Sequence, residues 1–302
     1  MRFLFRERLH ISPETIETRI KDHCFTISRQ QADDFRSVVD DTPASQAVVD
    51  LIHPLFLSRI SWHIVENFNQ YLSQPIEPKL LKTLVHLSVD LEYKEALEYD
   101  KEYRVKSHLC QITPHRKGTR LTTRFEYFQD DRLVAVEHTT GILFGVKCIG
   151  QGRQIGSIPT KSRVSKKPMW ARTVSIDERL PYAYAAKAGI DAPIHTDPEY
   201  ARSIGLPDII LQGTCTFAKA VSVISNEPAF GLEEIAGVSA NFTGMLVTPN
   251  EIEVRVLFHS GDRLVFDVLD KDGKAVIKGG NIHKRPSPES EIIASDTTPH
   301  ES

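Results

Sequence analysis

A proline-containing segment in the second half of the sequence places a carboxylate and an imidazole close together. Asp191 and His195 flank Pro193, and Gly213 follows at the start of an apolar stretch. An imidazole titrates near neutral pH and serves as a general acid or base. A glycine in the first turn of a buried helix presents an unpaired N–H to a developing negative oxygen. These residue types suit proton removal beside a carbonyl, or addition of water across a conjugated double bond.

The run from Tyr184 to Gly213 resembles the MaoC-like (R)-specific enoyl-CoA hydratases and dehydratases. Their signature reads approximately Ser-Gly-Asp-x-Asn-Pro-x-His-x-Asp-Pro, then an Ala, a Gly and an Ile-x-His-Gly. The positions that fall in step with it are Pro193, His195, Asp197, Pro198, Ala201, Gly205 and Gly213. The resemblance implies a hot-dog fold, in which an antiparallel sheet wraps a long helix. It also implies that His195 is the catalytic histidine and that the Gly213 N–H polarises a thioester carbonyl.

The sequence departs from this signature at the catalytic aspartate. Counting back from His195, the family's Asp position holds Ile190 and its Asn position holds Ala192, with Asp191 between them. Two interpretations stay open. In the first, the loop turns Asp191 toward the cavity, where it forms a catalytic dyad with His195. In the second, Asp191 faces solvent and His195 works without that partner, which favours a different chemistry.

Three further residues are candidates for substrate binding. Tyr184 lies on the preceding helix, Gln212 stands where the family has His, and Phe242 lies in a strand that resembles the wall of the family's substrate channel. For Tyr184 we favour core packing over contact with substrate, and core packing explains Phe242 equally well. We expect Asp197 to cap a short helix that begins at Pro198 rather than to take part in catalysis.

A weak internal repeat organises the chain around this segment. A short strand at Phe25 leads through Ser28 to a helix, and the same order returns from Arg172, about 150 residues later. Each half continues with an apolar helix, expected over residues 54–68 in the first half and 213–224 in the second. Helices that are apolar over most of their circumference are buried by surrounding structure.

Alternating apolar residues after each helix indicate strands, and turn signals separate them at Asp130-Asp131 and Asp272-Gly273. A helix followed by a meander of strands, given twice, predicts an α+β fold with antiparallel sheet. Together with the resemblance, this pattern predicts a double hot-dog. The expected units are a degenerate N-terminal repeat (1–150), a linker (151–168), a C-terminal repeat with the active site (169–284) and a disordered tail (285–302).

Composition and charge argue against several classes of protein. Lys and Arg number 37 against 40 Asp and Glu, which gives a formal charge of −3 over 302 residues. This charge does not indicate general binding to nucleic acids or other polyanions. No apolar run approaches the roughly 18–20 residues that span a bilayer. Four cysteines lie far apart without a CxxC pair, unlike a zinc site or a disulfide scaffold. We expect a soluble, cytoplasmic protein, with a mitochondrial location left open.

The sequence therefore predicts a hydro-lyase with one active site, in the C-terminal repeat. The expected reaction is reversible hydration of a 2-enoyl thioester, or dehydration of a 3-hydroxyacyl thioester, carried on CoA or an acyl-carrier protein. Neither a metal-ligand cluster nor a Gly-rich dinucleotide loop is present, so no metal or redox cofactor is expected. We expect no nucleic-acid or membrane partner, and exposed sheet edges leave room for a homodimer.

Two alternatives to this function stay open. One is a MaoC-like enzyme of altered chemistry that acts on a branched, dicarboxylic or secondary-metabolite substrate. The other is a non-catalytic module that binds acyl thioesters.

Overall fold

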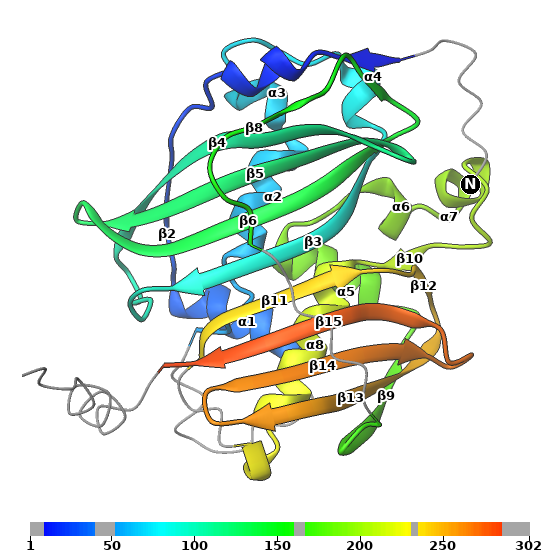
Figure 1. Ribbon diagram of the computed structural model, residues 1–302. Coiled ribbons are helices and arrows are strands. Elements are labelled where there is room, and N and C mark those ends of the chain that lie inside the picture. The colour runs from blue at the N-terminus through cyan, green and yellow to red at the C-terminus, as the bar shows by residue number, and fades with distance from the viewer. Residues whose placement is uncertain (1–8, 40–51, 160–166, 231–234, 286–302) are drawn as a thin grey trace, which may run out of the picture.

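The computed structural model describes residues 9–39, 52–159, 167–230 and 235–285. A long antiparallel sheet runs through both halves of the molecule, and the main helices lie behind it in the view of Figure 1. No helix within the described residues is long and apolar enough to cross a bilayer.

The N-terminal half has two main helices and a four-stranded meander. Its strands coincide with the alternating segments of the sequence, because one face of each strand is buried against the helices. The elements in chain order are β1 (His10–Ile11), η1 (Pro13–Glu17), β2 (His23–Thr26), α1 (Arg29–Val39), α2 (Ser58–Glu66), α3 (Phe68–Tyr71), α4 (Pro78–Leu81), β3 (Leu84–Tyr93), β4 (Glu102–His115), β5 (Gly118–Gln129), β6 (Arg132–Phe144), β7 (Lys147–Cys148) and β8 (Arg153–Gln154).

The C-terminal half repeats this order and adds short helices before its central helix, α8. The elements are β9 (Trp170–Ile176), α5 (Leu180–Ala188), α6 (Pro193–Thr196), α7 (Pro198–Ser203), β10 (Ile210–Leu211), α8 (Gly213–Ser225), η2 (Pro228–Phe230), β11 (Ile235–Phe242), β12 (Leu246–Val247), β13 (Asn250–Ser260), β14 (Arg263–Asp270) and β15 (Ala275–Lys284). Residues 214–224 of α8 are all buried, as its apolar composition predicts.

One pair of strands joins the two repeats into a single sheet. The strand order is β2-β4-β5-β6-β3-β11-β15-β14-β13-β9, with β8 paired to β4. Strands β3 and β11 pair antiparallel from Glu92 opposite Gly237 to Ser88 opposite Asn241. The helix-covered faces of the two repeats therefore belong to one continuous sheet, and elements of one repeat can contact elements of the other.

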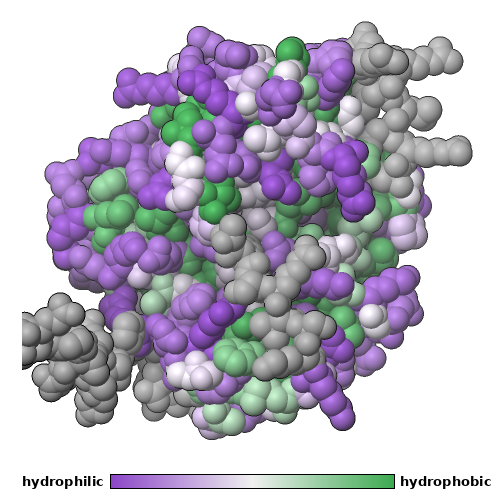
Figure 2. Space-filling model, viewed as in Figure 1, coloured by the Kyte–Doolittle hydropathy of each residue, from purple (hydrophilic) through white to green (hydrophobic). Residues whose placement is uncertain are grey.

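The opposite face of the sheet carries many hydrophilic residues, with hydrophobic patches between them (Figure 2). Along β5, Phe125 and Tyr127 are fully buried, whereas Arg124 and Glu126 alternate with them and form a partly exposed ion pair. This period of two is typical of an antiparallel sheet with one covered face. The hairpin after β5 also follows the prediction, because Asp130 and Asp131 both have positive φ, at 46° and 61°.

Two details differ from the sequence prediction. Helix α2 is shorter than the expected 54–68, because residues 54–57 form a turn and the side chain of Asn67 donates to the His63 carbonyl at the other end. Part of the expected linker is also ordered as β8, which pairs with β4. The unit boundaries as such stay predictions, and the expected tail lies outside the described residues except for Arg285.

Candidate functional site

The segment that carries Asp191 and His195 consists of two short helices behind a left-handed turn. Helix α5 ends at Gly189, whose φ of 68° is a conformation that glycine adopts without steric cost. Helix α6 then begins at Pro193, where the missing N–H of proline costs nothing. The loop between Gly189 and Pro193 is thereby fixed at both ends.

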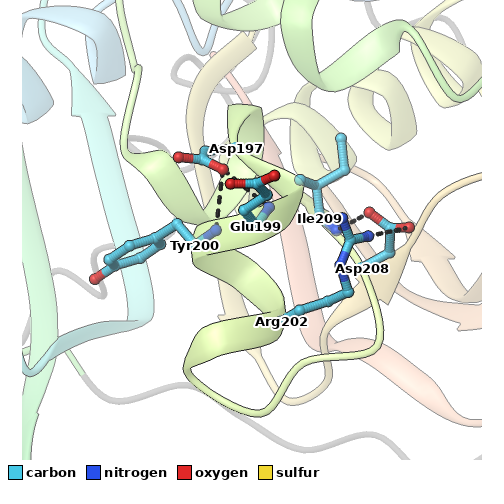
Figure 3. Close-up of polar contacts among 6 residues, drawn as sticks. All are labelled: Asp197, Glu199, Tyr200, Arg202, Asp208 and Ile209. Atoms are coloured by element: carbon cyan, nitrogen blue, oxygen red, sulfur yellow. Dashed lines mark hydrogen bonds and ion pairs between the residues drawn. The ribbon is translucent and has the colours of Figure 1, made fainter.

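Helix α7 is anchored by side chains of its own segment (Figure 3). The Asp197 carboxylate accepts hydrogen bonds from the backbone N–H groups of Glu199 and Tyr200, each at 2.9 Å. Arg202 reaches Asp208 at 3.5 Å, and the Asp208 carboxylate accepts from the N–H of Ile209 at 2.8 Å. The prediction that Asp197 is an N-cap is confirmed, and the following residues lead directly into β10.

The imidazole of His195 is held in one orientation by β10. Its Nδ1 lies 2.8 Å from the carbonyl oxygen of Ile210. Since a carbonyl only accepts, Nδ1 carries the proton and the Nε2 lone pair is left to act as a base. Burial lowers the pKa of His195, while the Ile210 carbonyl and the Asp191 carboxylate oppose that shift. The ring is therefore neutral at pH 7, as a general base must be.

Asp191 lies beside His195 without a described hydrogen bond to it. Its Oδ1 accepts from the Thr196 hydroxyl at 2.8 Å, and its side chain is exposed toward a cavity. Ile190, at the position of the family aspartate, is buried with 4% of its surface exposed. The structure agrees with part of each interpretation of Asp191. The side chain faces the cavity, as the first interpretation expects, but it bonds to Thr196 rather than to the His195 imidazole, as the second would allow.

Gly213 opens α8 under the ring of Phe242. A Cβ placed on Gly213 would lie 3.0 Å from Phe242 Cδ1, closer than ordinary van der Waals contact. The absence of a side chain thus lets the ring cover the helix N-terminus. Phe242 in turn contacts His86 of β3, with ring centroids 4.5 Å apart, so this part of the site includes the N-terminal repeat.

Gln212 and Tyr184 are buried supports of the site. The Gln212 side chain donates to the carbonyls of Pro181 at 3.0 Å and Ile190 at 3.3 Å, which ties α5 and the Asp191 loop to the start of α8. Tyr184 is fully buried and packs near Phe35, with ring centroids 5.9 Å apart. Neither side chain lines the cavity, and their contact with substrate stays a prediction.

A cavity of about 620 Å³ lies between the two repeats. The N-terminal repeat contributes the end of α2, α3, α4 and the start of β3, and the C-terminal repeat contributes residues 191–194 and part of α7. His195 and Gly213 lie outside this lining, although His195 directly follows it in the chain. The polar side chains around the cavity are those of Glu66, Asn67, Asn69, Gln70, Lys82, Asp191 and Tyr200.

Glu66, the last residue of α2, is one of several cavity residues that the sequence analysis missed. Glu66 is exposed at the mouth of the cavity; partial loss of water around its carboxyl and the nearby Asp191 carboxylate raise its pKa, while the backbone N–H of Asp191 acts in the opposite direction. Because 125 residues separate Glu66 from Asp191, no local pattern marks this contact. The described residues contain no cluster of three or more His, Cys, Asp or Glu that could hold a metal ion.

The topology defines the class of this protein as an α+β double hot-dog. A MaoC-like dehydratase from Phytophthora capsici has a similar fold, with a TM-score of 0.77 and 14% identity over 91% of this chain and 98% of that one. A conserved protein of Mycobacterium tuberculosis described as a double hot-dog fold has a TM-score of 0.56 and 11% identity, over 88% and 95% of the two chains. The predicted fold class is confirmed.

Residues 160–278, a stretch that takes in most of the C-terminal half, match the family described as MaoC like domain. The resemblance seen in the sequence is thereby confirmed. The enoyl-CoA hydratase ChsH3 of Mycobacterium tuberculosis is 32% identical over 90 residues. This match spans 29% of the present chain and 31% of that relative.

Proposed function

We propose that this protein is a hydro-lyase that hydrates a 2-enoyl thioester reversibly, or dehydrates the 3-hydroxyacyl thioester. The observation that carries the proposal is the state of His195. Its Nδ1–H is held by the Ile210 carbonyl, so Nε2 offers a neutral base within a MaoC-like segment, next to the cavity wall formed by residues 191–194. A neutral imidazole whose free nitrogen is fixed in direction can accept a proton from water.

The proposed chemistry assigns a separate task to each group. In hydration, His195 Nε2 takes a proton from water while the water oxygen bonds to C3 of the enoyl group. Negative charge moves onto the thioester oxygen, which the N–H at the first turn of α8, at Gly213, would stabilise. The proton held by His195 is then delivered to C2, and Asp191 orients the water. Dehydration is the same sequence in reverse.

The cavity supports an acyl thioester as the substrate. Its volume of about 620 Å³ lies within the range of small-molecule sites. Its walls combine apolar side chains such as Leu81 and Val85 with the polar groups around Asp191. Carriage of the acyl group on CoA is further supported by the name of the relative, an enoyl-CoA hydratase. An acyl-carrier protein as the alternative carrier stays a prediction.

A second candidate is a MaoC-like enzyme of altered chemistry. Two differences from the family signature favour it. The position of the family aspartate holds the buried Ile190, and the neighbouring Asp191 bonds to Thr196 instead of His195. A base without a hydrogen-bonded carboxylate partner suits a slower hydration, or elimination from a specialised substrate whose acyl group is branched or carries a second carboxylate. If the site has no catalytic activity at all, the remaining candidate is a non-catalytic module that binds acyl thioesters.

The proposal is tested by following the ultraviolet absorbance of a short 2-enoyl-CoA with the wild-type protein, His195→Gln and Asp191→Asn. We expect turnover by wild type, loss of roughly 10²–10⁴-fold in His195→Gln and a smaller loss in Asp191→Asn. Glu199→Gln is the matched control, because Glu199 is an exposed carboxylate of the same segment that does not line the cavity.

The outcomes separate the candidates. Equal turnover in wild type and His195→Gln would remove His195 from the mechanism. Tight binding of the enoyl-CoA without turnover, measured by calorimetry, would favour the binding module. Turnover of a branched or dicarboxylic enoyl thioester alone would favour the specialised enzyme.

A further inference from the structure

The cavity between the repeats shares a wall with a smaller pocket inside the N-terminal repeat. Trp62, Val65 and Leu84 line both spaces. Trp62 and Val65 are three residues apart on α2, so they lie on the same face of that helix, and Leu84 is the first residue of β3. Among the described residues only these three line both the cavity and the inner pocket, so together they form the partition between the two spaces.

The inner pocket is almost filled by the side chains around it. It lies between the helices α2 and α3 and the strands β3, β5 and β6, and its volume is about 10 Å³. This is at the lower limit of the space that one water molecule needs. The buried side chains of Phe68 and Leu121 line this pocket and do not line the cavity. A chain of methylene groups therefore cannot enter the inner pocket while the partition is in place.

Trp62 supplies most of the volume of the partition. Its ring makes a T-shaped contact with His86, with ring centroids 4.8 Å apart. The indole N–H of Trp62 is buried and has no hydrogen-bond partner among the described residues, whereas a buried tryptophan usually has one. Since the N–H contributes no hydrogen bond, the volume of the ring is what this residue supplies. Leu81 and Val85 also line the cavity, so the N-terminal repeat offers an acyl chain an apolar surface that ends at the partition.

We propose that Trp62 limits the length of the acyl chain that the site accepts. The inference rests on the hydratase proposed above and describes its substrate more closely, as a thioester whose acyl chain ends at the indole of Trp62. Carbons beyond that point have no space, because the inner pocket behind the ring is filled. A smaller side chain at position 62 joins the inner pocket to the cavity and admits longer chains.

The first test compares kcat/KM for 2-dodecenoyl-CoA and 2-butenoyl-CoA in wild type and Trp62→Leu. We expect the ratio of the long to the short substrate to rise at least tenfold in the variant, since one methylene group in an apolar pocket changes discrimination by roughly 10–200-fold. Trp62→Phe removes less volume and should raise the ratio by less. An unchanged ratio in both folded variants would overturn the inference.

Trp170→Leu is the matched control for this test. Trp170 is the other tryptophan of the chain, and it contacts Phe230 with ring centroids 5.5 Å apart. It lines neither the cavity nor the inner pocket. The same change of residue type at this position should therefore leave the ratio of long to short substrate at the wild-type value.

A double variant tests whether the longer chain uses the inner pocket. Leu121 lines that pocket and not the cavity, so Leu121→Phe adds volume behind the partition. Introduced into Trp62→Leu, it should bring the ratio of long to short substrate back toward the wild-type value. A double variant that keeps the full increase of Trp62→Leu would show that the long chain does not enter the inner pocket, and would reject the partition as the limit.

A binding measurement tests the same proposal without turnover. Trp62 is the single tryptophan of a Trp170→Phe protein, so its fluorescence reports on the partition alone. Saturated acyl-CoA thioesters have no double bond to hydrate. We expect octanoyl-CoA to shift the emission of Trp62 and CoA without an acyl group to leave it unchanged. Emission that responds to none of butyryl-, octanoyl- and dodecanoyl-CoA would overturn the inference.

These measurements distinguish the two proposals. Absence of turnover with every enoyl-CoA, together with a response of Trp62 emission to octanoyl-CoA, would reject the hydratase and retain Trp62 as the end of an acyl site. Turnover by wild type, with the same ratio of long to short substrate in Trp62→Leu, would retain the hydratase and reject the role of Trp62.

Discussion

A buried histidine that joins the two repeats leads to a quantitative prediction about stability and pH. His53 has 5% of its surface exposed, accepts the Leu55 N–H at Nδ1 at 3.0 Å and lies 3.0 Å from the Ser222 hydroxyl at Nε2. Because Nδ1 accepts, Nε2 carries the proton and donates it to Ser222. Burial, reinforced by the charge of Arg36, lowers the pKa of His53 from 6.5 to about 3.

The sign and size of the effect follow from proton linkage. The unfolded chain binds a proton at His53 near pH 6.5, whereas the folded protein stays neutral there until about pH 3. The contribution of His53 to stability is therefore complete above pH 6.5 and is lost as pH falls toward 3. Between pH 8 and pH 5 the loss amounts to about 2 kcal/mol, since 1.5 pH units lie between 6.5 and 5.

Urea unfolding at pH 8 and pH 5 measures this loss as the difference between two free energies of unfolding. We expect that difference to be about 2 kcal/mol smaller in His53→Gln than in wild type. Ser222→Ala is the control, because it removes the hydrogen-bond partner and leaves the imidazole, so it should lower stability at both pH values and keep the pH dependence. Equal pH dependence in wild type and His53→Gln would refute the neutral, buried state of His53.

Three further substitutions have expected outcomes. Gly213→Ala would push a methyl group into the Phe242 ring, so we expect kcat to fall roughly 10²-fold with little loss of fold, checked by the absorbance assay and circular dichroism. Tyr127→Phe removes the hydroxyl that donates to the buried Glu137 carboxyl at 2.7 Å, and urea unfolding should show a loss of about 1–3 kcal/mol. Asp197→Ala removes the cap of α7 and should cost about 1 kcal/mol in the same measurement, with unchanged values arguing against the cap.

The strands and their turns follow from the sequence because their signals are local. The segment Leu84–Tyr93 is predicted as a strand from the alternation of its apolar residues, and the Asp130-Asp131 pair marks a turn in which both residues have positive φ. The N-cap at Asp197 is also local, since the side chain bonds to N–H groups two and three residues later. These features depend on neighbours in the chain, so they can be predicted without knowing the fold.

The pairing of the repeats and the composition of the cavity do not follow from the sequence. Alternation identifies β3 and β11 as strands without identifying them as partners. The cavity combines the end of α2 with the Asp191 loop, whose residues are far apart in the chain. The part of the site that the C-terminal half supplies could be predicted, because Asp191 and His195 share one segment of the sequence. The contribution of Glu66 from the N-terminal half could not.

The role of Asp191 shows why a signature alone is insufficient. A shift of one residue puts Ile190 into the core and leaves Asp191 at the cavity, bonded to Thr196. Because side chains in loops need not alternate as they do in strands, the sequence alone does not determine which side the Asp191 carboxylate faces. The charge is kept near His195, while the hydrogen bond expected of a dyad is replaced by one to a hydroxyl.

The proposed mechanism depends above all on His195 acting as the base of a hydration reaction. Its most direct test is kcat/KM for a short 2-enoyl-CoA in wild type and His195→Gln, with circular dichroism confirming that both are folded. We expect a loss of roughly 10²–10⁴-fold in the variant. A folded His195→Gln that retains wild-type kcat/KM would contradict it.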